Sequence, residues 1–308
     1  WVVPENYQKY NGVFSYSDGS RTNGFNFTGM LYKSQWTSTD QIPLRAVNQG
    51  SLDRFGSLDP STGGETHRYS LSSQWTQTTL DRQAKAKLWA LQSALDLWSN
   101  FEYCMSSIQA TGNCAASDQF KQAEQRKALG FGFSEARYNA LNWGQNTYDT
   151  AMTWGLDGRT DRISPIGLYK TTQRKLTDTA REDRVIQNSI ALWAQNETRW
   201  TPQFRSIVGA RADIYQFDVQ SNIAVNSGHA KDRQLSPKLN LIYKPKSNFE
   251  VYANYGTGFH SNDARGTTIT VDPTDKTTAV TKVDPLVKAI GSELGFRTEL
   301  APGGRFGN

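Results

Sequence analysis

Apolar and polar residues alternate along much of this chain. In the stretch LSPKLNLIYKPKSNFEVYANYG, Leu239, Leu241 and Tyr243 alternate with Lys238 and Asn240. After a short break the same two-residue period returns over 249–255. Successive side chains of a β-strand point to opposite faces of a sheet, so this period predicts strands with one apolar face and one polar face.

The same alternation recurs from one end of the chain to the other. It predicts about eleven antiparallel strands, and a twelfth that begins at Phe306. The apolar faces of these strands include Tyr10, Phe14 and Tyr16; Tyr69, Leu71 and Trp75; Leu129, Phe131 and Phe133; Met152, Trp154 and Leu156; Ile186, Ile190 and Leu192; and Ile290, Leu294 and Phe296. The predicted fold class is therefore all-β.

The segment 84–103 is ambiguous. Its residues AKAKLWALQSALDLW are good helix formers, and Leu88, Leu91 and Leu95 fit a helical period. Its odd positions, among them Trp89 and Leu91, also form an apolar face of period two. Because the neighbouring segments all have the two-residue period, we interpret this segment as a strand with its odd positions on the apolar face.

Short and long connections alternate along the chain. The short ones are 18–23, 78–83, 138–145, 199–204, 244–248 and 301–305, and the long ones are 37–66, 104–123, 157–183, 218–234 and 260–284. In an up-and-down sheet, alternate connections lie at opposite ends. Short turns at one end and long loops at the other are typical of an outer-membrane β-barrel, with short periplasmic turns and long extracellular loops.

Composition agrees with a barrel at a lipid interface. The 308 residues have a mean hydropathy of −0.64 and yet 12% aromatic residues, with nine Trp and thirteen Tyr. The sequence has neither an apolar run of about 18 residues for a transmembrane helix nor a signal peptide, and it opens with Trp1 instead of Met. We therefore expect a processed chain or a fragment. Basic residues are scattered despite the net charge of +5, which argues against nucleic acid as a partner.

The two cysteines, Cys104 and Cys114, lie close together in the second long connection. A pair that closes a short loop suits a disulfide in an oxidising compartment. Two free thiols are the main alternative. A metal site is the least favoured interpretation, because neither a histidine nor another cysteine is nearby.

Several charged residues interrupt the predicted strands. Arg211 and Asp213 share one face, as do Glu293 and Arg297. Charges on the lipid face of a barrel cost a few kcal/mol near the bilayer midplane. We therefore expect all four side chains to face the lumen, either as a solvated wall with cross-strand pairs or as contacts to the ligand path.

The C-terminal third of the chain carries motifs of a known family. SPKLNLIYKPKSNFEVYANYGTGFHSNDARG resembles the barrel of TonB-dependent outer-membrane receptors, with its Ser-Pro-Lys-Leu strand and its Tyr-Ala-x-Tyr-Gly-x-Gly-Phe strand. IVGARADIYQFDV is similar to the Gly-x-Arg-x-Asp strand of that family, and ELGFRTEL to its Glu-Leu-Gly-x-(Arg/Lys) strand. The resemblance covers most of the chain and is strongest over 184–300.

The resemblance implies a transmembrane β-barrel of about 22 strands around an N-terminal plug domain. Residues 1–308 are then a fragment of the barrel domain that lacks the plug and the C-terminal strands. The family also implies uptake of a scarce ligand such as a ferric siderophore in the bacterial outer membrane, powered by the TonB complex through the plug. A passive porin or a surface-exposed β-rich binding module is the alternative.

Candidate ligand contacts lie in or beside the long connections. They are His229, His260, Asn262, Asp263 and Arg265. The histidines are dispersed and do not predict a metal site, and solvent-exposed loop residues are the simpler interpretation for them. The sequence contains no Gly-x-Ser-x-Gly, phosphate-loop or His-Glu-x-x-His motif, so we expect neither an enzyme nor a cofactor.

Overall fold

The structure is a computed structural model that describes residues 4–57, 59–101 and 118–298. Its strands are β1 (Gln8–Gly19), β2 (Gly24–Thr37), β3 (Gly63–Thr78), β4 (Arg82–Ser99), β5 (Phe120–Trp143), β6 (Asn146–Thr172), β7 (Lys175–Arg199), β8 (Phe204–Ser221), β9 (Gly228–Lys246), β10 (Phe249–Ser261) and β11 (Leu286–Thr298). Helices α1 (Leu44–Asn48), α3 (Ala264–Thr268) and η1 (Ala224–Asn226) lie in the connections. No helix of the described ranges is long and apolar enough to cross a membrane.

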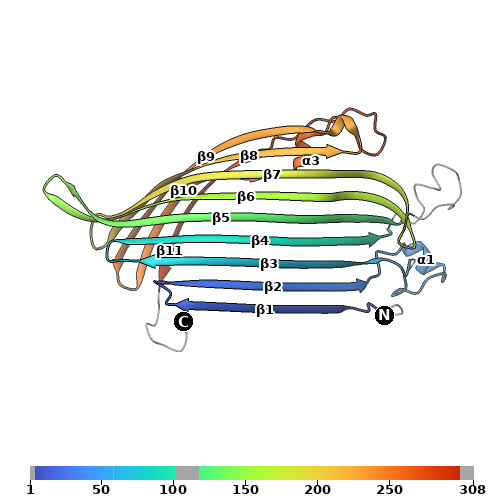
Figure 1. The fold of residues 1–308 in the computed structure, drawn as a ribbon, viewed down its shortest axis with the longest axis horizontal. Coiled ribbons are helices and arrows are strands. Elements are labelled where there is room, and N and C mark those ends of the chain that lie inside the picture. Colours follow the sequence, from blue (N-terminus) through green and yellow to red (C-terminus); the bar gives the residue numbers. More distant parts are fainter. Residues whose placement is uncertain (1–3, 58, 102–117, 299–308) are drawn as a thin grey trace.

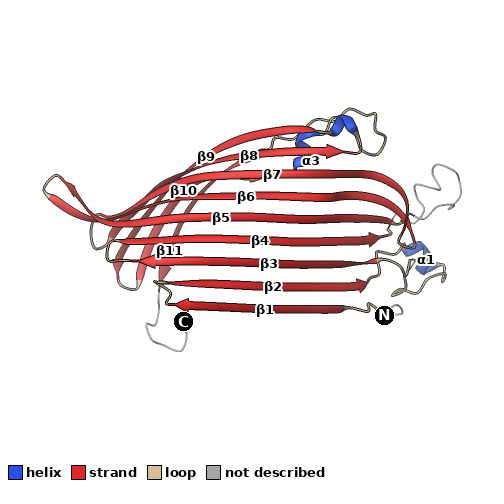
Figure 2. Ribbon diagram, in the orientation of Figure 1, coloured by secondary structure: helices blue, strands red, loops and turns tan. Residues whose placement is uncertain are grey.

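All the described strands form one sheet. Its order is β1 to β11 in chain order, and every strand is antiparallel to its neighbours in the sequence. The sheet curves into an open trough, with β10 and β11 behind β1–β5 (Figure 1), and strands make up nearly all of it (Figure 2). The predicted all-β, up-and-down architecture is confirmed as a partial barrel.

The two faces of the trough differ in chemistry and in burial. On one face, Ile190 and Leu192 are 48% and 59% exposed. On the other face, Asp161 and Asp213 are only 1% and 2% exposed. Side chains converge on the concave side of a curved sheet and diverge on its convex side. The charged face is therefore concave, and the apolar face is convex.

Strand β4 settles the helix-or-strand question of the sequence. It pairs with β3 and β5 over its whole length, so the predicted strand is confirmed. The predicted face was wrong. Leu88 and Ala90 lie opposite Ser73 and Leu71 on the convex face, and Trp89 shares the concave face with Lys87. On the concave face the charge of Lys87 is solvated, whereas on the lipid face it would be desolvated. This free-energy difference outweighs the preference of the apolar odd positions for the lipid face.

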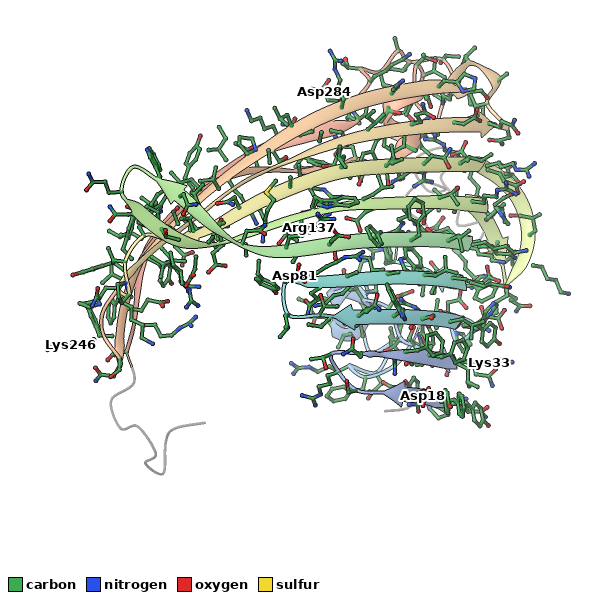
Figure 3. All side chains as sticks on the ribbon, turned by 60° about the vertical axis from the view of Figure 1, so that its left-hand side comes forward. Asp18, Lys33, Asp81, Arg137, Lys246 and Asp284 are labelled. Atoms are coloured by element: carbon green, nitrogen blue, oxygen red, sulfur yellow. The ribbon has the colours of Figure 1, made fainter. Side chains whose placement is uncertain are left out.

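The connections at the two ends of the sheet match the sequence prediction in part. Tight turns at 20–23, 79–81, 144–145, 200–203 and 247–248 occupy one end, the short-turn end. The predicted long connections 37–66 and 260–284 are loops at the other end, the long-loop end. The labelled Lys246 and Asp284 stand at these two ends, and side chains cover both faces between them (Figure 3).

Two predicted long loops are wrong. Most of 157–183 is strand, because β6 and β7 run for 27 and 25 residues to a tight turn at Gln173–Arg174. Most of 218–234 is likewise strand, and only 222–227 connects β8 to β9. A membrane-crossing strand needs only about 9–11 residues. These strands therefore continue beyond the bilayer, where the convex face becomes polar at Arg162, Arg184 and Asp218 and its apolar alternation ends.

Some sequence predictions fall outside the described residues. Cys104 and Cys114 lie in 102–117, and Phe306 lies in 299–308. The proposed disulfide and the start of a twelfth strand therefore stay predictions.

Candidate functional site

The connection between β10 and β11 folds onto the concave face at the long-loop end. Within it, α3 begins after Asp263, whose side chain accepts a hydrogen bond from the backbone N–H of Arg265 at 2.9 Å. Ala264 is 2% exposed and packs on Ile163, Val185 and Phe217 of the sheet. This small apolar contact holds the first half of the loop inside the trough.

Asn226 in η1 anchors the next part of the same loop. Its side chain is fully buried, and its Oδ1 accepts hydrogen bonds from the backbone N–H groups of Thr270 and Val271 at 2.8 and 3.0 Å. Its Nδ2 donates to the carbonyl of Val271 at 3.0 Å. One amide side chain thus replaces a strand partner for two consecutive residues, and it ties the β8–β9 connection to the β10–β11 loop.

A cavity of about 400 Å³ opens between this loop and the sheet. Strands β5, β6, β7 and β8 form its wall, and the loop forms its other side. Its lining residues are Glu124, Arg126, Arg159, Ile163, Ile166, Val185, Gln187, Tyr215, Ser261, Asn262, Asp263, Ala264 and Arg265. We call it the loop cavity.

Arginines paired with carboxylates dominate the electrostatics of the loop cavity. Asp161 lies between two of them, at 3.1 Å from Nη1 of Arg126 and 2.6 Å from Nε of Arg159. Arg265 donates to Asp263 at 2.6 Å. Burial raises the pKa of Asp263, but the hydrogen bonds and the charge of Arg265 outweigh burial and hold that pKa below its usual range. The carboxylate is therefore ionised near neutral pH.

A second charged group lies nearer the short-turn end. Asp157 accepts from Arg211 at 2.9 Å and from the indole N–H of Trp193 at 3.1 Å, and Lys87 approaches it at 3.3 Å. Arg211 also bonds Asp213 at 3.0 Å. A cavity of about 340 Å³ is formed around this group. The wall of the trough therefore carries its own counter-ions, as the cross-strand interpretation of the sequence expects.

Glu293 and Arg297 belong to a separate region of the same face. Glu293 lies opposite Asn254 and accepts hydrogen bonds from Tyr252 at 3.1 Å and from Asn254 at 3.3 Å. Arg297 lies opposite Glu250. The four residues expected to face the lumen thus lie on the concave side, in two groups on β8 and β11.

The structure brings together three of the five candidate ligand contacts. Asn262, Asp263 and Arg265 line the loop cavity. His260 is on β10, opposite Val287 of β11, and it directly precedes the cavity-lining residue Ser261 in the sequence. His229 lies on the convex face, 81% exposed, with its Nδ1 at 2.8 Å from Asp218.

Sequence reasoning missed the strand-borne half of the loop cavity. Arg126, Arg159 and Tyr215 come from three strands separated by many residues in the sequence. Only the strand register brings them to one place. Even positions of β5 and odd positions of β6 carry these charges, which is a weak signal that becomes useful only once both strand boundaries are known.

A second loop is tied down at the same end. The carboxylate of Asp59, in the β2–β3 connection, accepts from Asn100 at 2.9 Å and from Gln119 at 2.8 Å. Burial alone would raise the pKa of Asp59. These hydrogen bonds and those from Ser61 together outweigh burial, and they hold the pKa of Asp59 below its usual value. Arg174 at the β6–β7 tip donates to the carbonyl of Ser61 at 2.7 Å.

These groups are suited to binding. Guanidinium donors, carboxylates, two amides and a phenol surround the loop cavity, and they can orient a polar ligand by hydrogen bonds. In the described ranges, no three His, Cys, Asp or Glu side chains are grouped as a metal site. The arrangement can hold and release a polar solute at the long-loop end of the trough.

An open up-and-down sheet with an apolar convex face, a charged concave face and long loops at one end defines part of a bacterial outer-membrane barrel. The family model described as TonB dependent receptor-like, beta-barrel, matches residues 3–306. The chain belongs to the TonB-dependent receptor family, whose members are outer-membrane proteins that act as receptors and transporters.

Solved structures show the same fold. The ferric yersiniabactin uptake receptor FyuA from Yersinia pestis is 13% identical with a TM-score of 0.62, over 96% of this chain and 43% of that one. The closed form of the ferric-catecholate import receptor Fiu from E. coli K12 is 11% identical with a TM-score of 0.64, over 96% and 49%. The unliganded ferric citrate transporter FecA is 13% identical with a TM-score of 0.59, over 82% and 36%.

The chain therefore spans between about a third and a half of the length of these structures. No curated protein sequence matches it.

Proposed function

We propose that the chain is part of the barrel of an outer-membrane receptor that takes up a scarce ligand, such as a ferric siderophore, with energy supplied through TonB. The loop cavity carries this proposal. It lies on the concave face at the long-loop end, where a ligand enters from outside. Family membership and the names of the similar structures support the class of ligand.

In this proposal, Asn262, Asp263 and Arg265 contact the ligand from the loop, and Arg126 and Arg159 contact it from the wall. His260 is a contact at the rim. His229 has no such role, because its side chain faces away from the trough. Arg211, Asp213, Glu293 and Arg297 form a solvated wall that faces the plug domain of the complete receptor, and the TonB complex acts through that plug.

Binding by the complete receptor tests the site. Arg265→Ala removes a cavity-lining guanidinium, and we expect ferric siderophore binding, measured with the purified receptor, to weaken by roughly tenfold. Lys282→Ala removes the same charge from the same loop outside the cavity lining, and it should leave the affinity unchanged. Equal affinities for both variants and the unaltered receptor would place the ligand elsewhere.

Uptake by cells tests the energy coupling. Accumulation of a radiolabelled ferric siderophore should stop when a protonophore collapses the inner-membrane gradient, while binding at the surface persists. A passive porin would continue to equilibrate the solute, and a surface binding module would never accumulate it. Either result would replace the receptor proposal with the alternative function.

A further inference from the structure

Strands β9 and β10 separate towards the long-loop end of the sheet. They pair from the short-turn end as far as Lys238 and Gly256, and beyond that point these two described strands are not paired with each other. Each one nevertheless continues as a strand on its other side, β9 with β8 as far as Gly228 and β10 with β11 as far as Ser261. We call this interruption the split. It leaves residues 228–237 of β9 with a strand partner on one side only.

The part of β10 beyond the split, Thr257–Ser261, bends into the trough. We call it upper β10. Its Phe259 ring meets the ring of Tyr215 on β8 edge to face, with the ring centroids 5.6 Å apart. Upper β10 therefore reaches past β9 to the concave face of β8. Little opposes the bend, because a Cβ at Gly258 would meet no atom within 4 Å and Pro237, the first unpaired residue of β9, has no N–H to donate.

The sequence of upper β10 also suits a different position. If β9 and β10 stayed paired in the register that joins Gly256 to Lys238, Phe259 would lie opposite Leu235. Leu235 is on the convex face and 61% exposed. Phe259 would then continue the apolar positions of β10 that face lipid, such as Val251. The two-residue period thus runs through Phe259, although the structure turns this ring inward.

Polar atoms at the split lack partners. Within the described ranges, Oγ of Ser236 and Oγ1 of Thr257 are buried without a hydrogen bond. One side-chain bond spans the split, from the backbone N–H of Leu286 to Oδ2 of Asp232 at 3.2 Å. A buried polar group without a partner costs free energy. Pairing of upper β10 with the free edge of β9 would give the backbone groups of both edges partners.

Further unpaired polar atoms lie beneath the inward-folded loop. Asp183 is 2% exposed and lies two residues from Val185, which packs on Ala264 of α3. Oδ2 of Asp183 is 2.5 Å from Nε of Arg181. In the described structure, Oδ1 of Asp183 and Nη2 of Arg181 are buried without partners. Withdrawal of the loop would admit water to both atoms. The inward position is therefore stabilised by Ala264 and Asn226 and opposed by these unpaired groups.

We propose that upper β10 exchanges between two strand-pairing states and thereby gates the loop cavity. In the inward state, which the structure shows, β9 and upper β10 are separate and the loop forms one side of the cavity. In the outward state, upper β10 pairs with residues 233–237 of β9, and α3 leaves the trough with the loop. Because β10 and β11 are paired as far as Ser261 and Leu286, they move as one hairpin. The gate does not depend on which ligand is taken up.

Cysteine cross-linking in the complete receptor tests for the outward state. Gln234→Cys with His260→Cys puts two thiols opposite each other in the outward register, whereas these positions are not paired in the structure. Asn240→Cys with Asn254→Cys is the matched control, because Asn240 and Asn254 are already paired. After mild oxidation, peptide mass spectrometry maps the disulfides. We expect the control pair to form rapidly and the outward pair to form more slowly, as the hairpin swings out. A control disulfide without any outward disulfide would overturn the proposal.

Weakening the inward anchor should shift the exchange. Asn226→Ala removes hydrogen bonds that exist only in the inward state, so we expect the outward disulfide to form roughly tenfold faster. Val225→Ala, in the same turn, should leave that rate unchanged. Equal rates in both variants and the unaltered receptor would contradict the two-state exchange.

The opening of the cavity needs a separate measurement. Gln187 lines the loop cavity on the sheet side, so Gln187→Cys reports its accessibility to a bulky thiol reagent. Adding Asn226→Ala should raise the labelling rate of this cysteine by roughly tenfold, and adding Val225→Ala should not change it. Labelling that stays constant while the outward disulfide forms faster would show that the hairpin moves without gating the cavity, and the proposed gate would be wrong.

Discussion

Aromatic rings lie over glycines where neighbouring strands meet on the concave face. Trp89 of β4 covers Gly130 of β5, and Trp193 of β7 covers Gly155 of β6. A Cβ built at Gly130 would stand 2.4 Å from Cε2 of Trp89, a distance that atoms cannot adopt without movement of the ring. Glycine is required at this site by the space of the indole.

Gly130→Val should therefore destabilise the barrel. The indole of Trp89 must leave its place or the strands must separate, and overpacking of this kind costs about 1–3 kcal/mol. Urea unfolding of the complete receptor from lipid vesicles measures the change. Gly258→Val is the matched control, because a Cβ at Gly258 meets no atom within 4 Å. An equal effect of both substitutions would show that the covering ring is unimportant.

Asn226 is a second residue on which local structure depends. Asn226→Ala removes three acceptor contacts and one donor contact and leaves backbone groups of Thr270 and Val271 without partners. Each buried group left unpaired costs about 1–3 kcal/mol. We expect faster amide hydrogen exchange at these two residues and faster proteolysis over 272–278. Val225→Ala, in the same 3₁₀ turn and 59% exposed, should change neither rate.

At the residue scale, the sequence predicts faces better where charges are present. Arg211 and Asp213 could be directed away from lipid by their desolvation cost alone. The face of Trp89 could not be predicted from desolvation cost, because an indole is acceptable on either face of the sheet. Its position depends on Gly130, which lies opposite it on β5 and leaves room for the ring. Arg126 and Arg159 were likewise missed as cavity residues, since their neighbours come from register and from an inward-folded loop.

Among the elements, the β6–β7 hairpin departs most from the sequence prediction. Its apolar residues Ile163, Ile166, Leu168 and Tyr169 do not keep a two-residue period, and the residues from Lys170 to Asp183 are mostly polar, so a loop was expected. The backbone is nevertheless paired up to Thr172 and Lys175. Gln173 and Arg174 adopt positive φ values of 48° and 64°, as a two-residue hairpin turn requires. Strands that leave the bilayer lose the pattern by which sequence analysis finds them.

The tip of this hairpin is joined to the β2–β3 connection through the side chains of Gln119 and Arg174. Arg174→Gly keeps the positive φ acceptable but removes the hydrogen bond to Ser61 and the contact of the guanidinium with the Trp98 ring at 4.6 Å. We expect hydrogen exchange to increase over 170–178 and around Ser61. Gln173→Gly alters the same turn without removing either contact, and it should have little effect. Identical exchange in both variants would contradict this account of the tip.

For the whole molecule, the division into a lipid face and a water face can be tested on one strand. Val251 lies opposite Tyr243 and Phe296 on the convex face, and Asn254 lies opposite Glu293 on the concave face. Val251→Arg should destabilise the complete receptor in lipid vesicles by about 2–4 kcal/mol near the midplane. Asn254→Arg should have little effect, because water solvates the new guanidinium and Glu293 forms an ion pair with it. Equal unfolding free energies would contradict the assignment of faces.

The strand order equals the chain order throughout the sheet, so each β-hairpin pairs only with the hairpins before and after it. Contacts are consequently local in sequence, and assembly can proceed by adding one hairpin at a time. Loss or duplication of a hairpin would leave every other pairing intact. Because the diameter of a barrel grows with its strand number, such an event would change the bore of the channel while preserving the fold. The topology thus allows pore size to evolve in steps of two strands.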